Sequence, residues 1–214
     1  MNMKLLSAVV GIALSATVMS ASAQKTYTAG TITYKTSVRG QDVEVKEYFT
    51  PDSVATSFTA GPATIKLLTN ANHSSMAVLV DVPVASIKKA AIMTPDEIDQ
   101  ALAQLPTFTF TPGTDTKQIS GFNCKKVSAK DNKTGTSYDV WVTNDISVPA
   151  SAIPFYYKTI GGFPVQYTQF QQGQSTDVTV SSISDQKAPP GTFAIPSDFD
   201  KITMDDLKSM GGGK

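Results

Sequence analysis

The stretch Thr31–Val38, with the sequence TITYKTSV, indicates the fold class because apolar and polar residues alternate along it. Ile32, Tyr34 and Val38 fall on one face of a strand, and the other face carries Thr31, Thr33, Lys35 and Ser37. This period of two is typical of an antiparallel strand with one face in the core and one in water. A turn over residues 39–42 leads into the alternating stretch Val43–Phe49, so the two stretches predict a β-hairpin.

The same period continues through most of the chain. Short apolar–polar alternations are separated by clusters of turn residues, a pattern typical of all-antiparallel sheets. The further strands that it predicts are 54–59, 64–69, 76–82, 107–111, 117–120, 123–129, 137–143, 165–171 and 177–184.

Helices are expected at two places, with a third, weaker candidate over Val84–Met93. The run Thr94-Pro95-Asp96-Glu97 is a capping box, with proline at the first helical position, and an apolar stripe of Ile98, Leu102 and Leu105 follows it. Near the C-terminus, Thr203–Leu207 opens a second short helix. A parallel α/β fold needs a crossover helix between successive strands, which this chain lacks. The sequence therefore predicts a mainly β (α+β) fold, a curved antiparallel sheet or incomplete barrel with two or three short helices on its concave side.

Length and charge exclude several classes of protein. The chain has 214 residues, with 18 Lys and Arg against 18 Asp and Glu, and 41% of its residues are hydrophobic. This apolar content is too high for a disordered chain. Nucleic-acid binding calls for clustered excess cations, so the balanced charge argues against that partner. A single cysteine excludes an internal disulfide framework.

The N-terminus has the pattern of a signal peptide. Lys4 precedes the apolar run Leu5–Val18, and Ala21-Ser22-Ala23 is a typical cleavage site. The run is too short and too interrupted to span a bilayer as a stable helix, so an integral membrane protein is not expected. We therefore expect cleavage after Ala23, a periplasmic or secreted protein, and a single domain over 24–214.

Candidate catalytic and metal-binding residues are few. A metal site needs several His, Cys or carboxylate ligands at suitable spacing, whereas His73 stands alone in a loop over 70–75 and Cys124 stands alone in a strand. A Cys124–His73 dyad is conceivable, but a lone cysteine is more often a small buried apolar residue. No nucleophile elbow or phosphate-binding glycine loop occurs. We expect no catalytic residue, metal or cofactor, and hence not an enzyme.

Aromatic residues crowd into the C-terminal part of the chain, within residues 155–170 and at Trp141. They either fill the core between sheet and helices or line an apolar cavity on one face of a curved sheet. For the second alternative, the helix stripe and the aromatic residues would face each other. The candidate ligand-binding residues are then Ile98, Leu102, Trp141, Tyr156, Phe163 and Tyr167.

The C-terminal half resembles a known family. It carries, in order, ISGFNCKK at Ile119–Lys126, VWVTNDI at Val140–Ile146, IGGFP at Ile160–Pro164 and FAIP at Phe193–Pro196. These motifs resemble the DUF4412 family of exported proteins of the Bacteroidota and, more distantly, the GLPGLI-type proteins. The resemblance covers about 119–210 and implies a fold similar to the LolA/LolB-type proteins, an antiparallel sheet curled around helices.

Two functions from different classes are compatible with these residues. In the first, the protein binds or carries an apolar ligand, such as a lipid or a lipoprotein acyl chain, between sheet and helices. The family resemblance favours this hypothesis of ligand binding, but only through analogy of fold. In the second, a non-catalytic envelope protein with a filled core acts through contacts with a protein partner that the sequence does not identify. A sizeable apolar cavity would favour the first and a fully packed interior the second.

Overall fold

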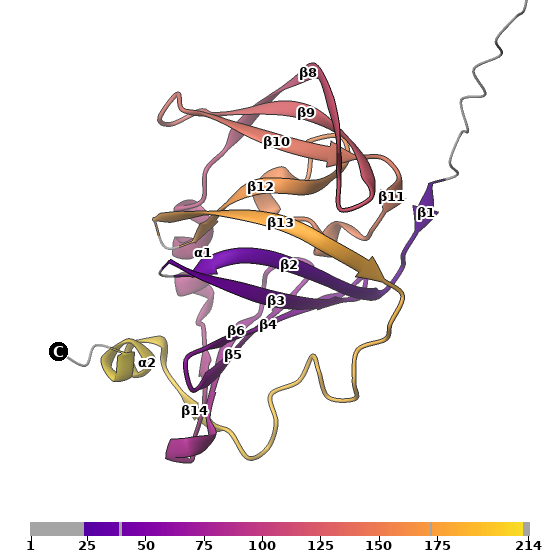
Figure 1. Cartoon of the computed structure of the whole chain (residues 1–214). Coiled ribbons are helices and arrows are strands. Elements are labelled where there is room, and N and C mark those ends of the chain that lie inside the picture. The colour runs from indigo at the N-terminus through magenta and orange to yellow at the C-terminus, as the bar shows by residue number, and fades with distance from the viewer. Residues whose placement is uncertain (1–23, 39, 172, 212–214) are drawn as a thin grey trace, which may run out of the picture.

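One large curved sheet forms the body of the protein (Figure 1). The computed structural model describes residues 24–38, 40–171 and 173–211. The strands of the sheet are β2 (Gly30–Val38), β3 (Gln41–Phe49), β4 (Ser53–Ala60), β5 (Ala63–Asn70), β6 (Met76–Val82), β7 (Ile87–Ile92), β8 (Phe108–Ile119), β9 (Phe122–Asp131), β10 (Ser137–Thr143), β12 (Phe163–Gln171), β13 (Gln174–Ser184) and β14 (Asp200–Ile202).

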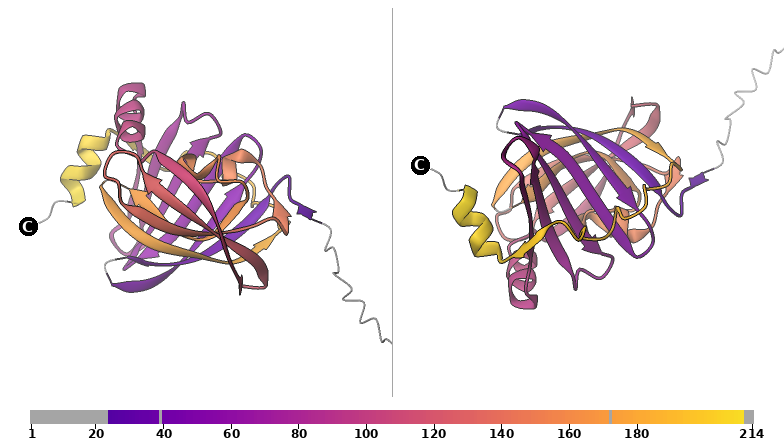
Figure 2. Two further views of the ribbon diagram at one scale, coloured as in Figure 1. Left: turned by 90° about the horizontal axis from the view of Figure 1, so that it is seen from above. Right: turned by 90° about the horizontal axis from the view of Figure 1, so that it is seen from below.

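These strands form a 12-stranded sheet in the order β14-β7-β6-β5-β4-β3-β2-β13-β12-β10-β9-β8. Neighbouring strands are antiparallel except β14 and β7, which pair in parallel at one edge. The sheet curls without closing (Figure 2). A separate parallel pair joins β1 (Lys25–Thr26) to β11 (Ile146–Ser147). The expectation of a mainly β, largely antiparallel fold is confirmed.

Most expected strands are present, with two differences. The stretches 107–111 and 117–120 form the single strand β8, which is irregular between Pro112 and Thr116. The expected helix over Val84–Met93 is wrong: a 3₁₀ turn, η1 (Pro83–Ala85), is followed by β7. The sequence of β7, IKKAAI, suits a helix by propensity, but β7 lies between β6 and β14 and hydrogen-bonds to both. Sheet pairing thus overrides the local preference.

The two helices predicted from capping patterns are confirmed. Helix α1 (Pro95–Ala103) begins with a complete capping box, in which the backbone N–H of Thr94 donates to the Glu97 carboxylate at 2.7 Å and the Glu97 N–H donates to the Thr94 hydroxyl at 3.3 Å. Helix α2 (Met204–Gly211) begins in the same way with Thr203 and Asp206. These bonds use backbone donors that a helix N-terminus leaves unpaired.

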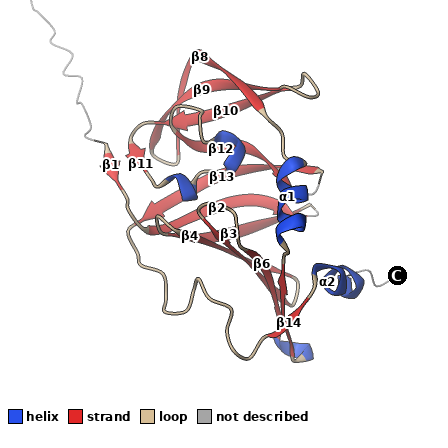
Figure 3. Cartoon of the chain, turned by 180° about the vertical axis from the view of Figure 1, so that it is seen from behind, coloured by secondary structure: helices blue, strands red, loops and turns tan. Residues whose placement is uncertain are grey.

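Two segments between strands lie on the concave side of the sheet (Figure 3). Strands β7 and β8 are consecutive in the chain but lie at or next to opposite edges of the sheet, so residues 93–107, which contain α1, pass over that side. The second segment leaves β10, returns to the neighbouring strand β12 and contains the 3₁₀ turns η2 (Ala150–Ala152) and η3 (Phe155–Tyr157). Helix α2 differs from expectation: it lies against β7, beyond the β14 edge, because it directly follows that short strand.

The convex face of β4–β7 is covered by an irregular segment, residues 185–199, which we call the strap. Phe193, Ile195 and Phe199 of the strap pack on a buried apolar cluster of Ala55, Leu68, Ala77, Leu79 and Ala90. Among the described residues, no helix is both long enough and apolar enough to cross a membrane. The expected signal peptide, residues 1–23, lies outside the described residues.

Candidate functional site

One half of the concave side is filled by a dense aromatic core. The rings of Phe108 and Tyr157 stack with centroids 5.5 Å apart, and Tyr157 is fully buried. Its hydroxyl donates to the carbonyl of Thr168 at 2.8 Å, and the Tyr156 hydroxyl accepts from the N–H of Phe170 at 3.0 Å. Each buried phenol therefore has a partner, as such groups require. This half of the interior is packed by its own side chains.

The structure brings together only some of the expected pocket residues. Phe163 and Tyr167 are buried in this core, and Tyr156 packs against it. Trp141 packs at its margin, with the ammonium of Lys117 at 4.1 Å from the ring centroid. Trp141 pairs with Gln166, the neighbour of Tyr167 on β12, so it lies on the opposite sheet face from Tyr167.

The expected helix stripe stands apart from this core. Ile98 is buried and Leu102 is half-buried, yet neither belongs to the two buried apolar clusters of the described residues. The six expected residues therefore do not surround one common space.

The inner face of β4–β6 is packed less densely. Phe58 pairs with Ile65, and Ile65 pairs with Val80; in the next row, Leu67 pairs with Val78. Phe58 packs against the interior core, which places both rows on the inner face. We call these five residues the apolar strip. All of them are half-buried, whereas Ile32 on β2 and Val178 and Val180 on β13 are buried on the same inner face.

A polar cluster lies beside the apolar strip. Glu47 on β3 pairs with Ile32 on one side and Thr56 on the other, so its carboxyl is on the inner face. The Tyr34 hydroxyl donates to Glu47 Oε1 at 2.9 Å and the Thr56 hydroxyl donates to Oε2 at 3.2 Å. Burial raises the pKa of Glu47 to about 7, against the opposing effect of these two hydrogen bonds.

The sequence analysis missed Glu47, although a signal was present. In the alternating stretch Val43–Phe49, Glu47 occupies the same face as Val45 and Phe49, where a charged residue is out of place. A carboxylate on the apolar face of a strand marks a position that needs partners in the core. Its partner Tyr34 comes from the first strand of the same predicted hairpin.

A third cluster surrounds His73 in the turn between β5 and β6. The ring of His73 meets that of Phe155 edge-on, with centroids 5.3 Å apart. Its Nε2 lies 3.5 Å from the ammonium of Lys158, and its Nδ1 lies 3.4 Å from the Thr69 hydroxyl. Burial, followed by the charge of Lys158, lowers the pKa of His73. The expected loop position is confirmed, but His73 is half-buried and makes specific contacts.

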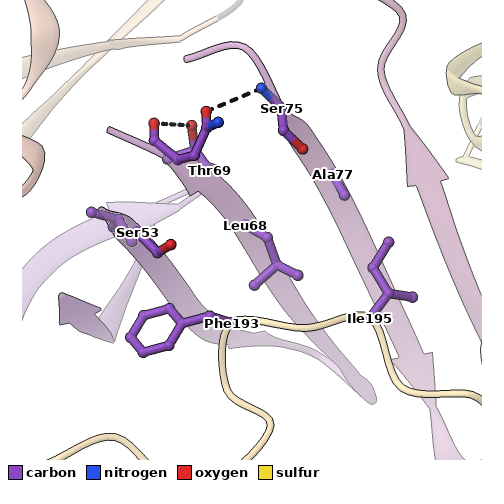
Figure 4. Close-up of a pocket in the computed structure, with 9 residues that line it drawn as sticks. Ser53, Leu68, Thr69, Ser75, Ala77, Phe193 and Ile195 are labelled. Atoms are coloured by element: carbon purple, nitrogen blue, oxygen red, sulfur yellow. Dashed lines mark hydrogen bonds between the residues drawn. The ribbon is translucent and has the colours of Figure 1, made fainter. Parts of the chain in front are cut away.

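A crevice of about 210 Å³ opens on the convex side, between the strap and strands β4–β6 (Figure 4). Apolar side chains form its floor and one wall, and polar groups of the strand ends form its rim. The residues that line it are Ser53, Val54, Leu68, Thr69, Asn70, Ser75, Ala77, Phe193 and Ile195. None of them belongs to the pocket expected from the sequence.

Cys124 lies on β9 and is 1% exposed, as the sequence predicted. Burial, with a smaller effect of Asp145, raises the pKa of its thiol to about 11, which opposes formation of a reactive thiolate. A second hollow of about 280 Å³ lies beside it and is lined by polar residues of β8 and β9. Within the described part of the chain, no three His, Cys, Asp or Glu side chains are grouped as metal ligands.

Comparisons with known proteins give a distant structural likeness. No family model matches the chain, and no curated protein matches it. A structure of PNGF-II in space group C2 is similar to 85% of this chain at 18% identity and a TM-score of 0.49, and one in space group P21 is similar to 86% at 17% identity and the same score. The matches cover 32% and 33% of those chains, so this chain spans about a third of their length.

Proposed function

We propose that this protein is an exported, non-catalytic binding protein that holds the apolar part of a small amphipathic molecule against the apolar strip. The proposal includes membership of the DUF4412 family, a relationship to the LolA/LolB-type carriers, and export through residues 1–23. The single observation that carries it is the incomplete burial of the inner face of β4–β6, beside an interior that is otherwise packed.

The packing of the two sheet faces supports a ligand on the inner side. On the outer face of the same strands, Leu68, Ala77 and Leu79 are buried under the strap, so the chain covers that face itself. On the inner face, Leu67 and Val78 keep part of their surface accessible. Each methylene group of a ligand that moves from water onto such a face contributes about 0.8 kcal/mol of favourable transfer free energy to binding.

The surroundings of the strip favour a slender chain over a protein surface. Both α1 and the segment with η2 and η3 lie on the same side of the sheet as the strip, which favours a slender ligand over a flat partner surface (Figure 3). Along β5 the inner face runs from Ile65 through Leu67 of the strip to Thr69 beyond it, four residue steps or about 13 Å at the usual rise of a strand. This length suits a medium-length alkyl chain.

The second candidate function is that of a non-catalytic envelope protein, which acts through contacts with a protein partner and binds no small ligand. The aromatic core around Tyr157 is filled, as this alternative requires of the whole interior. If the strip residues are covered by small rearrangements of α1, the protein acts through its outer surface instead. The two candidates differ in one measurable property, the saturable binding of an apolar probe.

A fluorescent fatty-acid analogue titrated into the mature protein tests the proposal. We expect saturable binding by the unchanged protein, and Val78→Phe to weaken it by about tenfold or more, equivalent to about 1.4 kcal/mol, because the added ring occupies ligand space. Val84→Phe is the matched control, since Val84 is 84% exposed in η1. Absence of saturable binding, together with a loss of about 1–3 kcal/mol of stability in Val78→Phe, would instead favour the second candidate, a non-catalytic protein with a filled core that acts through a protein partner.

A further inference from the structure

The cluster around His73 has the chemistry of an anion site. We propose that Lys158 and His73 together bind the carboxylate or phosphate head group of an amphipathic ligand whose apolar chain lies on the strip, an inference that rests on the proposed function for the position of that chain.

The ammonium group of Lys158 forms no ion pair with a carboxylate among the described residues. Among the described residues, the ion pairs involve other lysines, and the ammonium of Lys158 instead approaches the Nε2 atom of His73 at 3.5 Å and the ring of Phe155 at 5.2 Å from its centroid. A neutral imidazole and an aromatic face satisfy an ammonium only in part, because neither carries a negative charge. The ammonium can therefore turn to an incoming anion.

The hydrogen-bond partners of His73 assign its tautomer. The Thr69 hydroxyl donates to the carbonyl of Asn70 at 3.3 Å, so its oxygen is free to accept from Nδ1–H of His73. Nε2 then carries the lone pair that faces Lys158. When an anion approaches, Nε2 takes one proton from solvent and becomes a second charged donor. Lys158 is the charged group that faces the imidazole, and its effect on His73 is reduced once the anion is bound.

The turn holds the imidazole in place. His73 has a φ of 56°, in the left-handed region that a non-glycine residue rarely adopts. The Asn70 side chain fixes this turn, because its amide donates to the Ser74 hydroxyl at 2.9 Å and its oxygen accepts from the N–H of Ser75 at 3.1 Å. The ring of Phe155 supports the imidazole from the side. The site is thus positioned before any ligand arrives.

The position of the cluster suits one end of the strip. Thr69 pairs with Val54 and with Met76, and Val54 belongs to the interior core, so Thr69 lies on the inner face in line with Leu67 and Ile65. Phe155 is 47% exposed and offers an apolar surface beside the head group. Glu47, in the row of Thr56 and Leu67, repels an anion deeper along the strip once the pH exceeds its raised pKa of about 7. These charges orient a ligand with its anionic end at Lys158.

His73 is the only histidine of the chain, so its Hε1 proton gives an isolated NMR signal for a pH titration. We expect decanoate to raise the pKa of His73 by about one unit or more, as an anion within a few ångströms does, and decanol, with the same chain and no charge, to leave it unchanged. Lys158→Gln should raise the pKa of His73 in the free protein and abolish the response to decanoate. Lys130→Gln, which changes an exposed lysine of β9, should respond like the unchanged protein.

A titration with inorganic phosphate, an anion without an apolar chain, distinguishes the anion site from the proposed binding of an apolar chain on the strip. If phosphate alone raises the pKa of His73 but no apolar probe binds, the anion site stands and the proposed function is wrong. If decanoate displaces the fluorescent analogue while the pKa of His73 stays constant, the proposed function stands and the anion site is overturned. A response to decanoate that persists in Lys158→Gln would also overturn the anion site.

Discussion

Replacing Glu47 by glutamine should remove a large pH dependence of stability. Glu47 is half-buried with its carboxyl on the inner face, and partial removal from water raises the pKa of this carboxyl from the ordinary 4.5 to about 7. A pKa difference of one between the folded and unfolded states corresponds to about 1.4 kcal/mol, so Glu47 makes the stability of the fold vary with pH by about 3 kcal/mol. Glutamine keeps an oxygen for the Tyr34 hydroxyl and brings an amide that can donate to the Thr56 hydroxyl.

The sign of this effect is fixed by the direction in which the pKa of Glu47 moves. The folded protein binds the proton of Glu47 more tightly than the unfolded chain does. The stabilisation is therefore complete below the unfolded pKa of 4.5 and is lost as the pH rises through about 7. His73 acts in the opposite direction, since its lowered pKa favours the folded state as the pH rises through the unfolded value of 6.5.

Guanidinium unfolding at pH 5 and pH 8 measures the effect. We expect the unchanged protein to lose more stability between these values than Glu47→Gln does, by about 2–3 kcal/mol, because both proteins share the contribution of His73. Glu44→Gln is the control, since Glu44 is exposed on the same strand. Equal pH dependence in Glu47→Gln and in the unchanged protein would refute the burial of this carboxyl.

Three further expectations rest on the described contacts and the sequence. Cys124→Ala should cost about 1–3 kcal/mol of stability, and a thiol reagent should label the native protein slowly; rapid labelling would contradict the burial of Cys124. Thr94→Ala should cost about 1 kcal/mol in a denaturant titration through loss of the capping box, and no change would show that α1 does not depend on it. Protein purified from its native envelope should have the intact mass of a chain beginning at Gln24; a species that still begins at Met1 would contradict export.

The sheet was largely predictable because the sequence patterns that indicate its strands and turns extend over only a few neighbouring residues. Period-two alternation identifies strands without knowledge of their partners, and the turn residues expected at 39–42 indicate the first hairpin, although Gln41 and Asp42 already pair within β3. The capping box at Thr94 likewise lies within four residues. Strand β7 was not predictable in this way, because its Lys and Ala residues favour a helix and only pairing with β6 and β14 makes it a strand.

The candidate sites depend on contacts between distant residues, which explains why the sequence predicted less of them. His73 and Lys158 are 85 positions apart, and no local pattern joins them. In the sequence, the apolar strip on β4–β6 does not differ from the inner face of any other strand. Alternation shows which residues point inward but not how completely other side chains cover them. The expected pocket placed Trp141 with Tyr167, whereas the register of β10 and β12 puts them on opposite faces. Glu47 was the exception, since its position among apolar neighbours was visible in the sequence.

The most direct test of ligand binding on the inner face is methyl NMR during titration with decanoate. The strands supply matched probes, because Ile65, Leu67 and Val78 point to the inner face while Leu68 and Leu79 point to the outer face under the strap. We expect saturable changes in the resonance positions of the inner methyl groups and unchanged signals from the outer ones. Changes confined to Leu68 and Leu79, or no saturable change at any of the five, would contradict a ligand on the inner face.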